Sequence, residues 1–307
     1  MTERAELVIA ARETITHGSH SFAAASKLFA PVTRERAWLL YAWCRAADDL
    51  TDGQELGHGA GARPDPAATQ ARLEALTAAA LDTDAAVPLP FAALRQIARE
   101  VAMPRRFIAD HLAGFALDAA DWRPDSEDDL LRYCYYVAGS VGCMMAVVMG
   151  VSPQADDTLD RACDLGLAFQ LANIARDVVP DAAARRCYLP RQWLVAEGLV
   201  EAELADPRHR PALARLATRL VKLARAYRCS ARVGAARLPF RSRLAVLAAD
   251  GIYGAIGENV IALGEQAWDQ RVRVSGAGKF ALIGQAAVRS FGTPAMAPRD
   301  WLWTRPR

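Results

Sequence analysis

The segment RAADDLTDGQ, from Arg45 to Gln54, places three acidic residues at the end of an apolar run. Asp48 and Asp52 are four residues apart, so on a helix they share one face, about 6 Å apart along the axis. Asp49 lies beside them. Asp is a mediocre helix former, and like charges at this spacing repel each other. The arrangement therefore needs a source of positive charge.

A second acidic segment, NIARDVVPD, follows the apolar run LGLAFQLANI far downstream. Asn173, Asp177 and Asp181 recur at four-residue steps and would form one stripe if the helix continued. Pro180 removes a backbone donor and disfavours a helical conformation at the preceding residue. We therefore expect Asp181 to lie just past the helix end and to contribute less than Asp177.

Two anionic patches beside apolar segments favour a divalent-metal site over the plainer alternative, a pair of solvated helix faces. Mg²⁺ takes oxygen ligands and binds a few carboxylates while phosphate oxygens complete its shell. If the two stripes face each other, they would hold several Mg²⁺ ions, or Mn²⁺ in their place, with a diphosphate between them. The candidate metal ligands are Asp48, Asp49, Asp52, Asn173, Asp177 and Asp181.

Basic residues close to these acids fit the same chemistry. Arg45 is one turn before Asp49, and Arg176 is next to Asp177. A guanidinium group can bind two phosphate oxygens at once. An ordinary surface role is an equally open interpretation for Arg176 and for Arg271. The segment DQRVRVSGAGK supplies three further candidates, Arg271, Arg273 and Lys279.

The sequence contains little that would indicate a di-iron, zinc or nucleotide site. A di-iron bundle would need paired Glu-x-x-His motifs, and the one match, ELGH (Glu55–His58), lies in a Gly-rich stretch. The five His are scattered, which argues against zinc. GHGAG follows a predicted helix rather than a strand, and GAGK is followed by Phe280 instead of Ser or Thr. We therefore expect no nicotinamide nucleotide and no ATP.

Composition narrows the partners and the compartment. The formal net charge is +2 and aromatic residues make up 7%, so nothing indicates a nucleic-acid partner. The six Cys form no C-x-x-C pair, which favours a reducing compartment. The beginning of the chain, MTERAELVIAARET, does not resemble a signal peptide. These features predict a cytoplasmic protein. The run from Val137 to Val151 is too short to span a membrane and predicts a buried helix.

Apolar residues recur at three- and four-residue steps through nearly the whole chain, which predicts an all-α fold in a single domain. Thr33 is a plausible N-cap for one helix, and an Asp/Ser cap with an acidic first turn begins another. The long helices are expected over residues 33–52, 124–150, 156–179, 210–235 and 240–270.

Two breaks and a tail interrupt this pattern. The Gly- and Pro-rich stretch Gly53–Thr69 predicts a surface loop or lid, and Val274–Phe280 a shorter break. The core is expected over residues 15–290, with a flexible tail at 291–307. Its end, APRDWLWTRPR, with Trp301, Trp303, Arg305 and Arg307, could lie on an anionic membrane surface. A disordered tail is an equally open interpretation.

Several segments in order resemble the squalene/phytoene synthase family. YAWCRAADDLTDG resembles its first aspartate motif, and YCYYVAGSVG its central helix signature. LGLAFQLANIARDVVPDAAARRCYLP resembles the second aspartate motif with the following Arg-x-Tyr segment. The resemblance runs from GSHSFAAASKLF to AWDQRVRVS and is strongest to the bacterial phytoene synthases of carotenoid pathways.

This resemblance implies a prenyltransferase in an isoprenoid-synthase-type helical bundle around a hydrophobic cavity. Such enzymes join two geranylgeranyl diphosphates head to head through prephytoene diphosphate, release diphosphate with the help of Mg²⁺, and need no reductant. The product is a large hydrocarbon, so peripheral contact with the inner face of the cell membrane and with other carotenoid-pathway enzymes is expected.

The resemblance also implies roles for individual residues. Tyr253 is expected to act in catalysis together with Asp48, Asp52, Asp177 and Asp181, and Phe169 to line the cavity. The small residues Ala138, Gly139, Ser140 and Gly142 would leave room for a prenyl chain, or would allow close helix packing. The residues expected to bind substrate are Ser19, Ser21, Phe22, Tyr41, Arg45, Tyr133, Gln170, Arg273 and Lys279.

Three alternatives remain open. A terpene cyclase or a chain-elongating prenyltransferase shares paired aspartate motifs. A dehydrosqualene- or squalene-type synthase would use farnesyl diphosphate, and cavity depth, which selects chain length, cannot be read from one sequence. A non-catalytic assembly factor would be expected to have lost metal ligands, whereas both motifs are present here.

Overall fold

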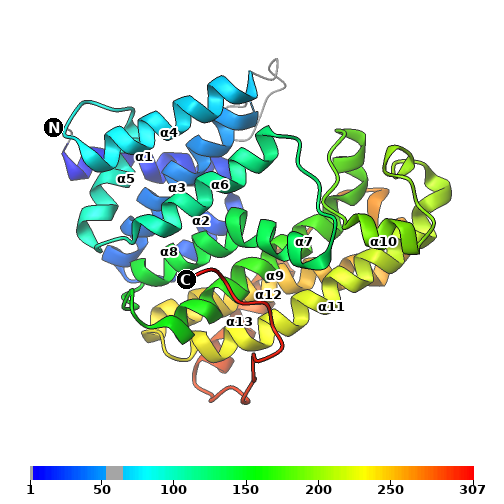
Figure 1. Ribbon diagram of the computed structural model, residues 1–307. Coiled ribbons are helices and arrows are strands. Elements are labelled where there is room, and N and C mark those ends of the chain that lie inside the picture. Colours follow the sequence, from blue (N-terminus) through cyan, green and yellow to red (C-terminus); the bar gives the residue numbers. More distant parts are fainter. Residues whose placement is uncertain (1–2, 53–64) are drawn as a thin grey trace. The chain divides into compact units, whose positions relative to one another are not determined.

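The computed structural model describes residues 3–52 and 65–307, without the side chains of His20, Ser21 and Asp52 (Figure 1). Within these ranges the chain forms helices and no strand, which confirms the all-α prediction. Most of the expected loop or lid, residues 53–64, lies outside the described residues. Its last part is helical, because α4 begins at Pro66 with Asp65 as its N-cap.

The chain divides into two compact units, each discontinuous in sequence. Unit 1 is Met1–Ala120 with Met144–Ala155, and unit 2 is Asp121–Cys143 with Asp156–Arg307. The expectation of a single domain stays a prediction. The helices of unit 1 are α1 (Arg4–Gly18), α2 (His20–Ser26), α3 (Pro31–Asp52), α4 (Pro66–Asp82), α5 (Leu89–Glu100) and α6 (Arg105–Ala119).

Helix α3 is the centre of unit 1 and contacts all five of its other helices. Its buried face carries Leu40, Trp43 and Ala47, which leaves the acidic residues on a half-exposed face. The helix begins at Pro31 rather than after Thr33, because proline fits the first turn, where its missing N–H has no helical partner.

Unit 2 is built around one long helix, α9, which packs against α7, η1, α11 and α12. The sequence predicted the cap of α7 correctly, since Ser126 and Asp129 form a reciprocal capping box. The elements are α7 (Glu127–Cys134), η1 (Tyr135–Gly139), α8 (Ser140–Val148, shared with unit 1), α9 (Asp156–Ala183), α10 (Arg191–Ala196), η2 (Glu201–Glu203), η3 (Pro207–His209), α11 (Arg210–Ala235), α12 (Phe240–Leu263), η4 (Gly264–Trp268) and α13 (Gly276–Ser290).

The expected single helix over 124–150 is interrupted by a π-helical turn at Tyr135–Gly139. Beside this turn, small residues let α9 approach closely. A Cβ on Gly166 would lie 2.4 Å from the carbonyl oxygen of Ala138, and one on Gly142 would lie 2.5 Å from that of Ala162. These glycines therefore serve close helix packing, one of the two roles that the sequence left open.

The prediction that the helix stops near Pro180 is wrong. Helix α9 continues through this proline to Ala183, and its end is closed by hydrogen bonds from the amide of Arg186 to the Asp181 carbonyl and from that of Arg185 to the Ala182 carbonyl. Arg185 has a φ of 59°, as in a Schellman C-cap. Proline therefore costs one backbone hydrogen bond, and Asp181 remains helical.

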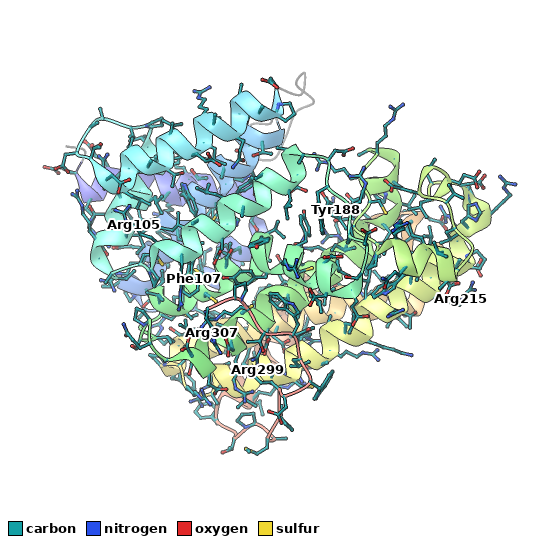
Figure 2. All side chains as sticks on the ribbon, in the orientation of Figure 1. Arg105, Phe107, Tyr188, Arg215, Arg299 and Arg307 are labelled. Carbon is teal, nitrogen blue, oxygen red and sulfur yellow. The ribbon has the colours of Figure 1, made fainter. Side chains whose placement is uncertain are left out.

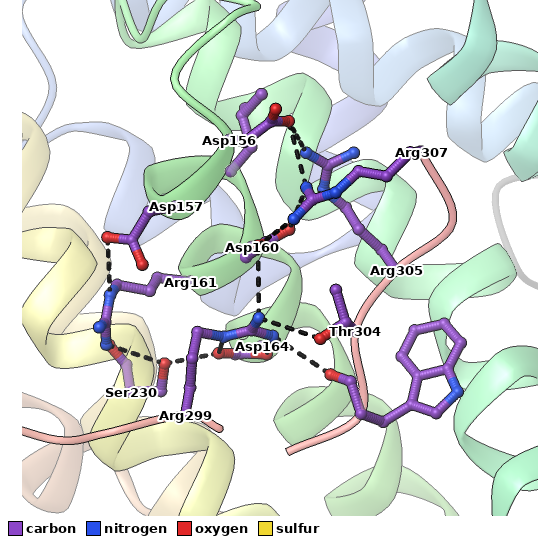
Figure 3. Close-up of polar contacts among 12 residues, drawn as sticks. Asp156, Asp157, Asp160, Arg161, Asp164, Ser230, Arg299, Thr304, Arg305 and Arg307 are labelled. Atoms are coloured by element: carbon purple, nitrogen blue, oxygen red, sulfur yellow. Dashed lines mark hydrogen bonds and ion pairs between the residues drawn. The ribbon is translucent and has the colours of Figure 1, made fainter. Parts of the chain in front are cut away.

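The C-terminal segment is bound to the first half of α9 rather than loose. Asp156, Asp160 and Asp164 lie four residues apart and point toward the arginines of this segment (Figure 3). Arg299 donates to Asp164 at 3.0 Å and Arg305 pairs with Asp160 at 2.9 Å. Figure 2 labels Arg299 and Arg307 beside this helix.

Burial makes this ion-pair cluster part of the core. The Asp164 carboxylate is fully buried and also accepts a bond from Ser230 at 2.5 Å. Burial raises the pKa of Asp164, although Arg299 and Ser230 oppose the change. Trp303 packs against Tyr135 with ring centroids 5.8 Å apart. The expected flexible tail is thus tied to unit 2, with Arg299 and Arg305 largely enclosed and Arg307 paired at the surface.

Two described helical stretches, Glu127–Val148 and Phe240–Trp268, are long and apolar enough to cross a membrane by length and composition alone. Within their most apolar windows 61% and 50% of the residues, respectively, are buried inside the protein. This burial is typical of core helices and agrees with the sequence interpretation of 137–151 as a buried helix.

Replacing Arg299 by alanine should destabilise the chain strongly, because Asp164 would remain buried without its cation. We expect a loss of roughly 3–5 kcal/mol in the free energy of unfolding, measured by chemical denaturation. Arg307, whose side chain is 52% exposed, provides the matched control, and Arg307→Ala should cost about 1 kcal/mol or less. Similar small losses in both variants would show that the cluster is not a structural anchor.

Candidate active site

In unit 1, the first acidic segment forms a cluster of charges on the half-exposed face of α3. Arg45 pairs with Asp48 at 3.3 Å and with Asp49 at 3.1 Å. The Arg45 side chain is 17% exposed, whereas that of Asp48 is 44% exposed. Asp52 is the last residue of the same helix, and only its backbone is described. Arg45 thus lies at the first acidic segment, and its expected role in binding phosphate stays a prediction.

Aromatic and polar residues from the α1–α2 junction lie against the same face. Phe22 meets Tyr41 edge to face with centroids 5.6 Å apart, and Ser19 caps α2 by accepting a bond from the Phe22 amide. A Cβ on Gly18 would lie 2.6 Å from the Tyr41 hydroxyl oxygen, so glycine is needed there. The expected site residues Ser19, Phe22, Tyr41 and Arg45 thus come together, whereas the Ser21 side chain lies outside the description.

The environment of Tyr41 keeps its hydroxyl protonated. Burial raises the pKa of Tyr41 to about 12; Arg45 lowers it, and Asp48 and Asp49 raise it further. A neutral phenol next to a guanidinium group can donate a hydrogen bond to an anionic ligand without adding negative charge.

In unit 2, the second acidic segment forms a half-exposed stripe on α9. Because the helix continues to Ala183, Asn173, Asp177 and Asp181 share one face at four-residue spacing. These three side chains and Gln170 are partly exposed, while their neighbours Leu171, Ile174 and Val178 are buried. The stripe has the ligand types and spacing that the sequence indicated, and it includes Asp181, which we expected to lie beyond the helix.

Two arginines hold the Asp177 carboxylate. Arg176 donates from Nε to Oδ1 at 2.9 Å and from Nη2 to Oδ2. Arg271, from the segment after η4, donates to Oδ2 at 3.4 Å. That segment is held in place by Trp268, whose Nε1 donates to the Ala175 carbonyl at 3.3 Å. The sequence left Arg271 and Arg176 evenly balanced with a surface role, and the structure places both at the stripe.

Phe169 and Tyr253 form an aromatic wall at the same part of unit 2. Their rings are stacked with centroids 4.0 Å apart and planes 16° apart. Burial raises the pKa of Tyr253, while the charge of Arg176 lowers it. The expected roles of Phe169 in lining a cavity and of Tyr253 in catalysis stay predictions.

Other expected substrate-binding residues are placed differently. Tyr133 is buried, and its ring is stacked on those of Trp122, at 5.8 Å, and Tyr188, at 4.9 Å. Its expected role in substrate binding stays a prediction. Arg273 is exposed in the segment before α13, and Lys279 lies in the first turn of that helix. The expected break at 274–280 therefore ends at residue 275.

The oxygen donors fit a hard divalent cation. Within the described side chains, no group of three or more His, Cys, Asp or Glu could by itself hold a metal ion. Asn173, Asp177 and Asp181 offer one amide and two carboxylates, and Mg²⁺ characteristically binds through few carboxylates while phosphate oxygens and water fill its shell. A carboxylate has enough lone pairs to bind a guanidinium group and a cation together. The stripe thus suits a metal-bound phosphate and offers no thiolate or imidazole.

The two clusters belong to different units, α3 to unit 1 and α9 to unit 2. Each combines half-exposed carboxylates with arginine and an aromatic ring. Whether they act on one ligand, and whether a central hydrophobic cavity lies beside them, stay predictions.

Comparison with known proteins gives a consistent result. The family model described as squalene/phytoene synthase matches residues 15–277. A 15-cis-phytoene synthase of Enterobacter agglomerans is 48% identical over 295 residues, covering 94% of this chain and 99% of that protein. A 15-cis-phytoene synthase of Paracoccus sp. is also 48% identical, over 98% of both chains.

A solved structure supports the same assignment. The crystal structure of a dehydrosqualene synthase in complex with a ligand superimposes with a TM-score of 0.82 at 26% identity, covering 93% of this chain and 96% of that one. The family match spans both acidic segments and most of the two units, and the relatives match along nearly their entire length. The chain therefore belongs to the squalene/phytoene synthase family.

Proposed function

We propose that the protein is a 15-cis-phytoene synthase that joins two molecules of geranylgeranyl diphosphate head to head through prephytoene diphosphate and releases diphosphate. The observation that carries this proposal is the 48% identity to two bacterial enzymes of that name over almost the full length of each chain. The carboxylate and arginine clusters on α3 and α9 supply the groups that such a reaction needs.

The first requirement of this reaction is to stabilise charge on a departing diphosphate. Bound Mg²⁺ would supply a Lewis acid for the phosphate oxygens. Asn173, Asp177 and Asp181 would hold it on the α9 side, and Asp48, Asp49 and Asp52 on the α3 side. Arg45 and Arg271, which already pair with these acids, would also contact phosphate oxygens.

The second requirement is to protect allylic cations from water. Phe169 and Tyr253 would contribute an apolar, polarisable wall next to Asp177. Phe22 and Tyr41 would do the same on unit 1. The raised pKa of both tyrosines keeps their hydroxyl groups neutral, so they would not act as strong bases at neutral pH.

The main alternative is a dehydrosqualene- or squalene-type synthase acting on farnesyl diphosphate. The fold likeness to a dehydrosqualene synthase supports it, but the identity there is 26%, well below the 48% to the phytoene synthases. We further propose a cytoplasmic enzyme in peripheral contact with a membrane, because both its substrate and its product would be lipids.

Turnover of the purified chain with prenyl diphosphates tests the proposed function. With Mg²⁺, geranylgeranyl diphosphate should yield a hydrocarbon of phytoene mass and free diphosphate, while farnesyl diphosphate should react far more slowly. Chelation with EDTA should abolish turnover, and added Mg²⁺ should restore it. Preferred formation of dehydrosqualene, or turnover that is unaffected by chelation, would overturn the proposal.

Asp177→Asn and Asp181→Asn should both lower kcat by about a hundredfold or more, because both residues lie on the same helical face and each would lose a metal-binding oxygen charge. Asp157→Asn, a change on the same helix but away from the stripe, is the control and should leave kcat unchanged. Steady-state assays across Mg²⁺ concentrations measure the effect. A loss at Asp181 of less than tenfold would instead support the weaker role that the sequence suggested.

Arg271→Ala should raise KM for the diphosphate substrate by roughly tenfold or more, since a charge-assisted bond to phosphate would be lost. Arg273→Ala is the matched comparison two residues away, because Arg273 forms no ion pair with any acid that the structure describes. It should change KM less. The opposite order of effects would show that Arg273, and not Arg271, contacts the substrate.

A further inference from the structure

The outer face of α13 is apolar although it is exposed. Phe280 is 77% exposed, Val288 75% and Phe291 80%, and Met296 just beyond the helix is 93% exposed. Phe291 also contacts Phe240, itself 46% exposed, with ring centroids 5.1 Å apart. We call Phe280, Val288, Phe291 and Met296 the α13 patch. Scattered exposed apolar residues are common, but a contiguous set of this kind marks a contact surface.

The helix pattern shows that this exposure is systematic. Ala277, Phe280, Gly284 and Val288 recur at three- and four-residue steps along the exposed side of α13. The opposite side of α13, which carries the buried residues Ala286 and Ser290, packs on α12 (Figure 1). Helix α13 therefore has an apolar face on both sides, of which α12 covers one.

The charge around the patch has one sign. Residues 276–297 contain one Lys and one Arg and no Asp or Glu. Arg289 is exposed and forms no ion pair with any acidic residue in the described part of the chain. An apolar stripe accompanied only by basic residues is typical of a helix that lies in the interface of an anionic membrane.

A cavity of about 340 Å³ opens next to the patch and shares Met296 with it, and Arg289 also lines it. Arg232 and Arg243 also line it, and no acidic residue does. This volume is within the range of roughly 300–1,000 Å³ of small-ligand sites. The concentration of guanidinium groups predicts an anionic ligand, and phosphate is the group that they bind best.

Contacts within unit 2 leave this positive charge uncompensated. Arg232 pairs at 2.9 Å with the buried Asp250, but Arg228 pairs with the same carboxylate at 2.5 Å. Arg243 donates only to the carbonyls of Ser290, at 3.0 Å, and Ala236, and its enclosed Nε has no acceptor among the described atoms. One carboxylate thus serves two guanidinium groups, and the partly buried Arg243 has no acidic partner among the described residues, so a counter-ion would stabilise it.

We propose that the α13 patch and the adjoining arginine cavity bind the surface of a bilayer that contains anionic phospholipid. The four patch side chains enter the boundary between headgroups and acyl chains. Arg243 and Arg289 hold the phosphate of one acidic lipid in the cavity. This inference rests on the proposed peripheral membrane contact and assigns it to α13 in place of the C-terminal residues, whose Arg305 and Arg307 pair with acids of α9.

Co-sedimentation of the full chain with vesicles tests this surface. Vesicles of mixed phosphatidylglycerol and phosphatidylcholine should bind the protein at least tenfold more tightly than phosphatidylcholine alone. Phe280→Ser with Phe291→Ser should weaken binding by about tenfold or more, and Arg289→Glu should remove the preference for anionic lipid. Val195→Ser with Val200→Ser is the matched control, because these residues are 70% and 59% exposed at another surface, and it should bind normally.

Turnover in detergent separates this proposal from the proposed function, because the patch variants should retain wild-type kcat there. If the patch variants lose vesicle binding but keep normal turnover, the proposed surface is supported. If no protein turns over substrate but vesicle binding still differs between variants as expected, only the proposed function is overturned. Equal vesicle binding by all variants would overturn the surface. The proposed surface would also be overturned if the patch variants lost self-association and kept vesicle binding, because a second copy of the chain would then cover the patch. If inorganic phosphate binds in the cavity but does not release the protein from vesicles, the cavity does not hold a lipid headgroup.

Discussion

The structure of unit 2 depends on how the negative charges of α9 are compensated. This helix carries two sets of acids at four-residue spacing, Asp156, Asp160 and Asp164 near its beginning and Asp177 and Asp181 near its end. Acids repeated on one helical face repel each other. Each set is therefore stable only where cations from other segments meet it.

The charges of the two sets are compensated in different ways. Arginines from the last nine residues surround the first set, and the innermost carboxylate, Asp164, is fully buried. In the second set Asp177 stays 19% exposed between two arginines, on a face that is open enough for a ligand. Removing charges from water is costly unless they are paired. The inner pairs of the first set are hence part of the core, while the second set stays open to the metal-bound phosphate that we propose.

The same reasoning connects the candidate active site with the α13 surface. Arginines near the second set face acids, whereas those near α13 face carbonyl groups and a shared carboxylate. A paired guanidinium group positions a neighbouring acid, and an unpaired one attracts an anion from outside. Unit 2 therefore combines an anionic site and a cationic surface, which suits an enzyme whose substrate has a diphosphate head and a lipid tail.

The sequence by itself determined the all-α class, the long helices, the two acidic segments and the family, because local periodicity and ordered motifs carry that information. It did not reveal that α9 passes through Pro180, that Arg271 rather than Arg273 reaches Asp177, or that the C-terminal arginines pair with acids of α9. These outcomes depend on contacts between residues far apart in the chain. The spacing Asp-x-x-x-Asp is identical in a buried anchor and in a ligand site, and only the tertiary structure decides which cations reach it.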